Sequence, residues 1–366
     1  MRYLFINVTA GYGSTGRIAA DQCRALTAQG HTCVLAYGRK KANCDDVTTV
    51  RIGSDFDNRL HGLESRLLDN AGFCSRQATK KFLRWVGEYD PDVIWLHNLH
   101  GYYLHVGELF SYLRTCGKEI RWTLHDCWAF TGHCAYFDYV GCQKWKTGCH
   151  HCPQKSTYPA SFLADNSRKN YLRKRTLFTG IPNLTLTVPS HWLEGRVKES
   201  FLKDYPVEVI YNQVDKSVFK PTPGDFREKY HLENTKIILG VASVWKGLKD
   251  FLALSKLLSG EYKIVLIGLN DRQLAALPKE ILGLPRTDNV RQLVQAYTAA
   301  DVFVCPSTEE TFGMTVLEAC CCGTKTVVYQ DTACEEVAKA YGGIAVPRGP
   351  EHLRDAILEL TGGNAL

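Results

Sequence analysis

The sequence predicts an α/β protein made of two doubly wound domains, each a parallel sheet with helices on both faces. Three observations lead to this fold class. Short apolar runs alternate with amphipathic helical stretches, which is typical of strands buried on both sides of a parallel sheet. A glycine-rich turn directly follows the first apolar run. The chain of 366 residues is also longer than the roughly 250 residues that one core usually serves.

The predicted strands form two series separated by a linker. Residues 218–224 have the sequence Val-Phe-Lys-Pro-Thr-Pro-Gly, and this density of proline and glycine is typical of a connection between domains. We therefore expect an N-terminal domain at residues 1–221 and a C-terminal domain at residues 222–366, facing each other across a central cleft. The expected strands are residues 2–8, 31–37, 93–97, 120–125 and 184–188, then 236–241, 262–268, 302–305 and 326–329.

The composition excludes several classes of protein. With 45% hydrophobic and 22% charged residues, the chain is neither disordered nor of low complexity. No run approaches the ~18 apolar residues of a membrane-spanning helix. Residues 1–8 resemble a first strand more than a signal peptide, because glycines end the apolar run early. The fifteen cysteines are an odd number without an export signal, so we expect a cytoplasmic protein without a disulfide framework.

Charge is unevenly distributed along the chain. Residues 1–221 hold 29 Lys/Arg against 20 Asp/Glu, whereas the remainder holds 15 against 18. A basic first domain suggests an acidic partner, which could be a phosphate, an anionic membrane surface or a nucleic acid. The densest basic stretch, residues 168–175, is expected on a helix and is equally compatible with a solvated face.

The first candidate binding motif is the glycine-rich turn at residues 11–16, Gly-Tyr-Gly-Ser-Thr-Gly. Glycines at this position let the backbone approach a phosphate or sugar, and the helix that follows offers free N–H groups. The acidic residue of a dinucleotide fingerprint is missing, because Gly38-Arg39-Lys40-Lys41 follows the second strand. A tight turn without a ligand is the alternative.

The second motif follows the predicted strand at residues 302–305. Glu310 and Glu318 are eight positions apart, and Gly313 between them is where a loop should become a helix. The N-terminus of such a helix can bind a diphosphate through backbone N–H groups while the carboxylates accept from hydroxyls. Favourable placement of acids at a helix N-terminus, without any ligand, is the alternative.

The third motif is Lys246-Gly247, which lies between the strand at residues 236–241 and an amphipathic helix. A lysine beside a glycine at the carboxyl end of a strand is well placed for a phosphate oxygen. A solvated lysine would have the same sequence.

In this order, the three motifs resemble those of retaining nucleotide-sugar glycosyltransferases of the GT-B fold. The nearest group is the family-4 type, which includes bacterial exopolysaccharide and lipopolysaccharide enzymes such as those that make colanic acid. The resemblance covers nearly the whole chain. It is most specific in residues 303–328, 239–251 and 209–221, and it extends to residues 13–19 and 124–126.

The resemblance implies a site for a UDP or GDP sugar between the domains. Catalytic roles would fall to His125, Lys246 and Glu310. A glycan or lipid-linked saccharide would be the acceptor, with Asp126 and Arg17 on its side, and no cofactor would be required. The leaving phosphate would help to deprotonate the acceptor, which gives retention. The donor-binding residues implied in this way are Gly13, Ser14, Lys246, Glu310, Gly313, Met314, Thr315 and Glu318.

Two departures from the family pattern affect these assignments. The family generally has an arginine shortly before the lysine, but Val241-Ala242-Ser243-Val244-Trp245 contains none. Diphosphate binding would then depend on Lys246, with help from Lys249 or from elsewhere in the chain. Glu309 adjoins Glu310, so a one-residue bulge could exchange their roles, and the spacing favours Glu310.

A cysteine cluster follows His125. Cys149 and Cys152 have the two-residue spacing of half a zinc site, and Cys134 and Cys142 would complete it. We expect structural zinc, because the family needs no metal for its chemistry. Free thiols and an iron–sulfur cluster are the alternatives. Other residues nearby could substitute as ligands: His133, His150, His151 and Cys127.

The sequence therefore predicts a hexosyltransferase of bacterial surface polysaccharide synthesis, with peripheral contact to the inner face of the membrane. A GT-B epimerase or phosphorylase would retain the nucleotide or phosphate site but would lack the glycan acceptor. A zinc-stapled nucleic-acid-binding protein would explain the basic charge and the cysteines. It would leave Glu310, Glu318 and Lys246 unexplained, and no basic–aromatic pattern supports it.

Overall fold

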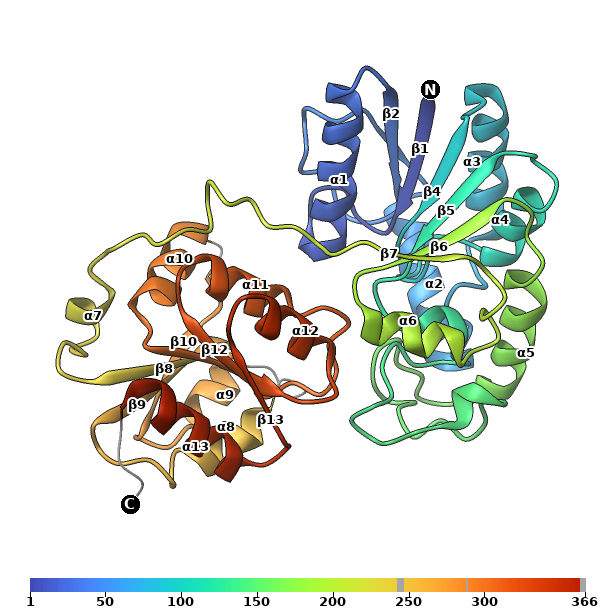
Figure 1. Ribbon diagram of the computed structural model, residues 1–366. Coiled ribbons are helices and arrows are strands. Elements are labelled where there is room, and N and C mark those ends of the chain that lie inside the picture. Colours follow the sequence, from blue (N-terminus) through green and yellow to red (C-terminus); the bar gives the residue numbers. More distant parts are fainter. Residues whose placement is uncertain (242–246, 288, 363–366) are drawn as a thin grey trace. The chain divides into compact units, whose positions relative to one another are not determined.

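The structure is a computed structural model that describes residues 1–241, 247–287 and 289–362. Its contacts divide the chain into two compact units, Met1–Ile210 and Tyr211–Leu366. Each unit contains one parallel sheet with helices on both faces (Figure 1). The prediction of two doubly wound α/β domains is thus confirmed. The observed division precedes the Pro/Gly-rich stretch at which the sequence placed the boundary.

The first unit contains a seven-stranded sheet in the order β3-β2-β1-β4-β5-β6-β7. Every pairing between neighbouring strands is parallel. The strands are β1 (Arg2–Asn7), β2 (Thr32–Tyr37), β3 (Thr49–Arg51), β4 (Val93–Leu96), β5 (Glu119–Thr123), β6 (Leu184–Val188) and β7 (Val207–Val209). The helices are α1 (Gly13–Ala28), α2 (Asp55–Leu68), α3 (Arg76–Tyr89), α4 (Val106–Leu113), α5 (Ser167–Phe178) and α6 (His191–Lys198).

The second unit contains a six-stranded parallel sheet in the order β10-β9-β8-β11-β12-β13. Its strands are β8 (Lys236–Val241), β9 (Tyr262–Leu269), β10 (Ile281–Pro285), β11 (Val302–Cys305), β12 (Lys325–Tyr329) and β13 (Ile344–Val346). Its helices are α7 (Phe226–Lys229), α8 (Leu248–Leu254), α9 (Asp271–Ala275), α10 (Val290–Ala299), α11 (Met314–Cys321), α12 (Ala333–Ala340) and α13 (Pro350–Thr361).

Both sheets are buried on two faces, which explains their continuous apolar strands. In β1, Leu4 and Ile6 belong to one core, and Phe5 between them belongs to the core on the opposite face. In β8, Leu239 and Ile238 divide in the same way between the two cores of the second unit. Successive side chains of a strand point to opposite faces, so such a strand must be apolar at nearly every position.

Chain order reverses between β1 and β4 in the first sheet and between β8 and β11 in the second. At such a point the loops that follow the two central strands run in opposite directions and leave space at the carboxyl edge of the sheet. The glycine-rich turn follows β1, and the loop with Glu310 follows β11. No helix among the described residues is long and apolar enough to cross a bilayer.

A long irregular segment connects β5 to α5 in the first unit and is anchored by the buried Lys174. The Lys174 ammonium donates to the carbonyl oxygens of Trp128 (2.7 Å) and Thr131 (3.1 Å). It also lies 3.4 Å from the centre of the Trp128 ring. Burial lowers the pKa of Lys174 to about 7. The lysine therefore ties α5 to the segment that follows His125.

Lys174 should give stability a distinctive pH dependence. Between pH 7 and about 10 the unfolded chain keeps a proton on Lys174 that the native protein has lost, so stability must rise with pH. Relative to a Lys174→Met variant, we expect the free energy of unfolding of the wild type to rise by about 1.4 kcal/mol per pH unit over this window. Urea unfolding of both proteins measures this difference, and parallel curves would contradict it.

Candidate active site

The turn after β1 needs its glycines for two different reasons. Gly11 and Gly13 adopt φ values of +74° and +65°, which side chains disfavour. A Cβ on Gly16 would lie only 2.6 Å from Thr9 Oγ1, so Gly16 lets α1 pack against the loop. Gly13 opens α1, the exposed Ser14 lies in its first turn, and the exposed Arg17 begins its second turn. The N-cap residue Tyr12 makes no side-chain capping hydrogen bond, so the first N–H groups of α1 can donate to an anion.

His125 follows β5 and is paired with a second histidine that the sequence analysis did not single out. Its Nε2 lies 2.9 Å from Nδ1 of His97, which follows β4, and the two rings are stacked at 5.2 Å. Burial lowers the pKa of His125 to about 4 and that of His97 well below its ordinary value. Both imidazoles are therefore neutral at pH 7.

The second nitrogen of His97 indicates which ring donates. Within the described part of the chain, His97 Nε2 is buried without a hydrogen-bond partner. A bare acceptor is less costly to bury than a bare N–H. We infer that His97 carries its proton on Nδ1 and donates it to His125 Nε2, so that the proton of His125 is on Nδ1.

Asp126 belongs to an adjoining polar chain. Its Oδ2 lies 2.7 Å from His100 Nε2, and its Oδ1 accepts from the Trp128 backbone N–H. His100 Nδ1 in turn lies 3.0 Å from the hydroxyl of Tyr158. Burial raises the pKa of Asp126, but the contacts with His100, the Trp128 N–H and His125 together outweigh burial and lower it overall. His97, His125, His100 and Asp126 line one small cavity of about 10 Å³, which is about the smallest space that can hold one water.

In the second unit, Gly313 and Glu318 lie as the sequence predicted. Gly313 has φ +92° and ends the loop, Met314 begins α11 with Thr315 after it, and Glu318 lies one turn into the helix. A Cβ on Gly313 would lie 2.7 Å from the sulfur of Cys334, so a larger residue does not fit. Glu309 and Glu310 are both half-buried on this loop.

Tyr297, at the end of α10, holds Glu318 in place. Its hydroxyl donates to Glu318 Oε2 at 3.0 Å. Burial, together with the Glu318 carboxylate, raises the pKa of Tyr297 well above its ordinary value, so the phenol keeps its proton and stays a donor. The sequence analysis did not identify Tyr297, which is 21 positions before Glu318.

Lys246 lies outside the described residues, so its predicted role stays a prediction. The neighbouring Gly247 is described and has φ +77°. A Cβ on Gly247 would lie 2.5 Å from Pro306, which directly follows β11. The turns after β8 and β11 therefore touch, and this contact requires a glycine at position 247.

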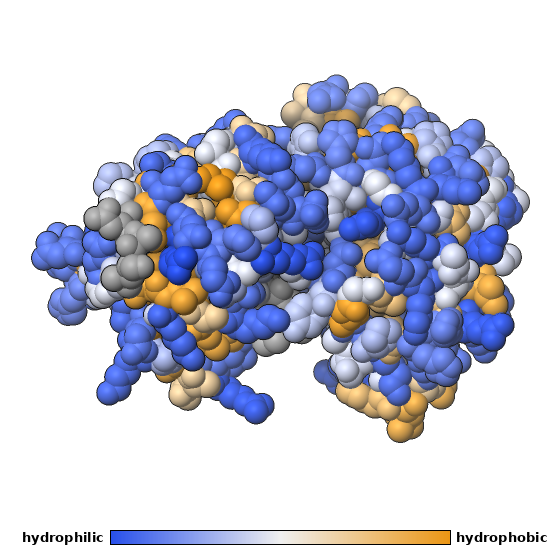
Figure 2. Space-filling view, turned by 60° about the horizontal axis from the view of Figure 1, so that its bottom comes forward, coloured by the Kyte–Doolittle hydropathy of each residue, from blue (hydrophilic) through white to orange (hydrophobic). Residues whose placement is uncertain are grey.

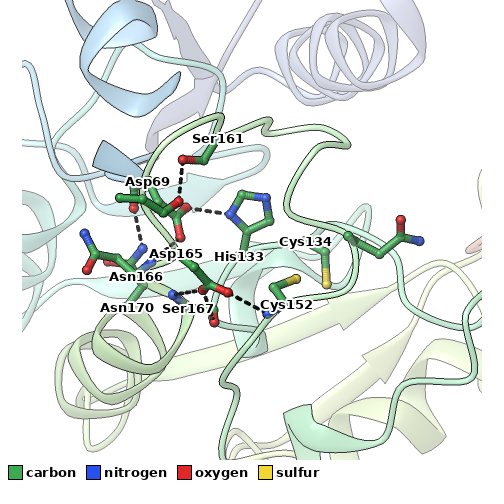
Figure 3. A network of polar contacts seen from close by, with 12 residues as sticks. Asp69, His133, Cys134, Cys152, Ser161, Asp165, Asn166, Ser167 and Asn170 are labelled. Carbon is green, nitrogen blue, oxygen red and sulfur yellow. Dashed lines mark hydrogen bonds and ion pairs between the residues drawn. The ribbon is translucent and has the colours of Figure 1, made fainter. Parts of the chain in front are cut away.

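The four cysteines of the predicted zinc site surround one small cavity of about 10 Å³, lined by Cys134, Cys142, Cys149 and Cys152. A hydrogen bond from the Cys134 thiol lowers the pKa of Cys152 to about 7, while that of Cys134 is well raised. His133, one of the alternative ligands, is instead paired with Asp69 at 2.5 Å (Figure 3). In the described ranges, no three His, Cys, Asp or Glu residues are arranged to hold a metal. The structure thus gives zinc no support.

Comparison with known proteins relates the second unit to a family and both units to a fold. Residues 225–364 match the family described as Glycosyl transferases group 1. WcaC of Escherichia coli K12, named as a colanic acid biosynthesis glycosyl transferase, is 32% identical over 197 residues, or 49% of this chain and 45% of WcaC. The N,N'-diacetylbacillosaminyl-diphospho-undecaprenol α-1,3-N-acetylgalactosaminyltransferase of Campylobacter jejuni is 30% identical over 125 residues, or 32% of this chain and 33% of that enzyme. The matches thus span less than half the length of these curated relatives.

The fold is that of known glycosyltransferase structures. HepE of Anabaena in complex with UDP-glucose aligns with a TM-score of 0.65 at 14% identity, covering 99% of this chain and 90% of HepE. The second unit thus matches the group 1 glycosyltransferase family, and the chain has the GT-B fold, as the sequence predicted.

The inferred tautomer of His125 can be measured. At pH 7 we expect the ¹⁵N shifts of His125 to show the proton on Nδ1, unchanged down to about pH 5 because the pKa is about 4. His97→Phe keeps an aromatic ring beside Phe5 and Trp95 but removes the donor. In this variant the donor that faces His125 Nε2 is gone, so we expect the ¹⁵N shifts of His125 to show that its proton is no longer confined to Nδ1. A wild-type His125 with its proton on Nε2, or a midpoint near 6.5, would contradict the inference.

Proposed function

We propose that the protein transfers a hexosyl unit from a nucleoside diphosphate sugar to a lipid-linked glycan during surface polysaccharide synthesis, with retention. The observation that carries this proposal is Glu318, held by Tyr297 one turn into α11 in the domain that matches the glycosyltransferase family. A fixed carboxylate near the N-terminus of a helix suits a ribose hydroxyl, while the N–H groups of the same helix end suit a diphosphate.

The nucleotide is proposed to be UDP. HepE, which shares the fold, was crystallised with UDP-glucose. In our assignment Glu318 accepts from the ribose, Gly313 lets the backbone approach the diphosphate, and Met314 and Thr315 present their N–H groups to it. Glu310, on the loop before α11, accepts from hydroxyls of the sugar.

Charge that develops during the reaction defines the remaining roles. Glycosyl transfer builds positive charge on the sugar and negative charge on the leaving phosphate. Donors fixed in advance toward such charge usually contribute most to catalysis. We assign this function to Lys246 and to the uncapped start of α1 at Gly13 and Ser14, on the phosphate side. His125, neutral and oriented by His97, would donate from Nδ1 to the sugar.

The proposed acceptor is a saccharide on a lipid diphosphate. The Campylobacter relative is named for an acceptor attached to diphospho-undecaprenol, and WcaC is named for a surface polysaccharide. Asp126 follows β5 and Arg17 lies in α1 of the first unit, and both would lie on the acceptor side. The His100 contact helps to keep Asp126 ionised at neutral pH, and an ionised carboxylate accepts from a hydroxyl more strongly than a neutral one.

Nucleotide binding tests the donor site without any acceptor. UDP at about 100 times its dissociation constant should stabilise the wild type by about 2.7 kcal/mol, which is measurable as a raised melting temperature. We expect Glu318→Gln to abolish this shift and Tyr297→Phe to reduce it. The control Glu359→Gln, on the exposed face of α13, should respond as the wild type does. A full response from Glu318→Gln would refute the assignment.

Transfer itself is tested with labelled UDP-hexoses and an extract of bacterial lipid-linked saccharides. We expect label in the lipid fraction, with the anomeric configuration of the donor retained. Glu310→Gln should lower the rate about 100-fold while the UDP-induced shift in melting temperature is unchanged, because this residue is assigned to the sugar alone. Conversion of the donor without any acceptor would favour an epimerase instead.

A further inference from the structure

Helix α2 has its polar side inward and its apolar side outward. Its buried residues are His61, Gly62 and Ser65. Its exposed face has five large apolar side chains, whose exposed fractions range from 37% to 74%: Phe56, Leu60, Leu63, Leu67 and Leu68. A helix on the surface of a water-soluble domain normally has the opposite arrangement. Because these five side chains face solvent, burial in the core of their own unit does not stabilise them.

Polar contacts fix this orientation. His61 Nδ1 lies 2.9 Å from Ser75 Oγ, and His61 Nε2 accepts from the Gly72 N–H at 3.2 Å. At the end of the helix, Asp69 is bonded to His133, Asn166 and Asn170 (Figure 3). Rotating the helix to bury its leucines would break these bonds and leave buried polar groups without partners. The outward apolar face is therefore a specified feature of the fold.

The apolar surface continues onto the loop beside the last turn of α2. Phe162 donates its backbone N–H to Arg66 O, and Ala164 donates to Leu67 O. Phe162 and Leu163 on this loop are 63% and 73% exposed. The face of the molecule drawn in Figure 2 is largely hydrophilic, with hydrophobic residues gathered in only a few places. Contiguous exposed apolar surface of this kind marks an interaction site.

Basic residues surround this surface. Exposed Arg59 and Arg66 lie on α2 itself. Asn58 of α2 holds the loop with Arg39, Lys40 and Lys41 through Gly38 O, at 2.8 Å. Beyond the other end of the helix, Asn166 donates to Leu68 O, and exposed Arg168 and Lys169 follow it.

The acidic residues of α2 all have partners. Asp55 pairs with Arg51, Asp57 accepts from Ser54 in the capping box, and Glu64 is bonded to the thiol of Cys74. Asp57 and Glu64 keep their negative charge in these contacts, as does the exposed Asp165 on the adjoining loop. The seven basic residues of the rim outnumber these three acids, so the net charge that this surface presents to a partner is positive.

We propose that this surface, formed by α2, residues 162–163 and the basic rim and called here the α2 face, docks onto an anionic phospholipid bilayer. A helix with one apolar face beside arginine and lysine residues lies in the plane of a membrane interface, with its apolar side among the acyl chains. Anionic headgroups attract the basic rim. Salt screens this attraction, so the protein should dissociate from the bilayer at high ionic strength. The positive rim favours a lipid surface over a second copy of the chain, which would present the same charge.

Aromatic contacts connect the α2 face to the candidate site. Tyr102 packs against His61 and is in edge contact with Tyr158, at 6.1 Å between ring centres. The Tyr158 hydroxyl contacts His100, which holds Asp126. A bilayer on the α2 face would thus be separated from the acceptor-side carboxylate by α2 itself and by the side chains of Tyr102, Tyr158 and His100. The delivery of a lipid-linked acceptor by this route rests on the proposed function, whereas docking itself does not.

Vesicle flotation tests the proposal. We expect the wild type to float with vesicles of phosphatidylethanolamine and phosphatidylglycerol at low salt, and to stay behind with phosphatidylcholine alone. The variant Leu60→Gln/Leu63→Gln/Leu67→Gln should lose at least about tenfold in vesicle affinity. Arg59→Glu/Arg66→Glu should lose a similar factor at low salt and less at high salt.

Matched variants control for apolar area and for charge. Val218→Gln/Val290→Gln/Tyr341→Gln removes three exposed apolar residues of the second unit, and Arg272→Glu/Lys279→Glu reverses two exposed charges there. Both should float as the wild type does. The UDP-induced melting shift, measured on every preparation, shows that each variant is folded and reports on the proposed function separately.

Three results would overturn the proposal. The first is a wild type that ignores anionic vesicles. The second is a triple-glutamine variant that binds them as well as the wild type does. The third is a wild type that forms a dimer and does not bind vesicles, together with a triple-glutamine variant that is a monomer. The third result would assign the α2 face to contact between copies of the chain.

Discussion

The parallel direction of every strand is the constraint on which the rest of this structure depends. Parallel strands all end at the same edge of a sheet, so residues distant in sequence meet there whenever they follow neighbouring strands. In the first unit this brings the end of β4 beside the end of β5, and so His97 beside His125. In the second unit it brings Gly247 against Pro306. The loops supply the chemical groups, and the sheet topology decides which groups can meet.

Burial and polar neighbours set the protonation states of the candidate site residues. Tyr297 stays protonated beside Glu318, so the pair keeps one donor and one carboxylate. His100 keeps Asp126 ionised in spite of burial. The two histidines are both neutral because neither can be charged at low cost in this environment. The result is a set of fixed donors and acceptors at neutral pH.

The sequence was sufficient for the parts of this structure that depend on local pattern. Apolar runs located the central strands, and glycines located the turns before α1 and α11. The partners His97 and Tyr297 were not identified, because their contacts join residues 28 and 21 positions apart and depend on packing. The periodicity of α2 shows an apolar stripe but does not say which side faces the core. The spacing of four cysteines predicted a zinc site. It could not show that His133, an alternative ligand, is paired with Asp69, because that partner is 64 positions away in the sequence.

The burial of Lys174 has a consequence for how the segment after His125 can be observed. An amine that water does not reach also cannot be reached by an acylating reagent, so Lys174 stays unlabelled while the segment is closed. Each opening exposes the amine and restores its ordinary basicity, and modification then traps the open form. Mass spectrometry can measure the rate of labelling at Lys174. This rate therefore reports how often the segment beside the candidate site detaches from α5.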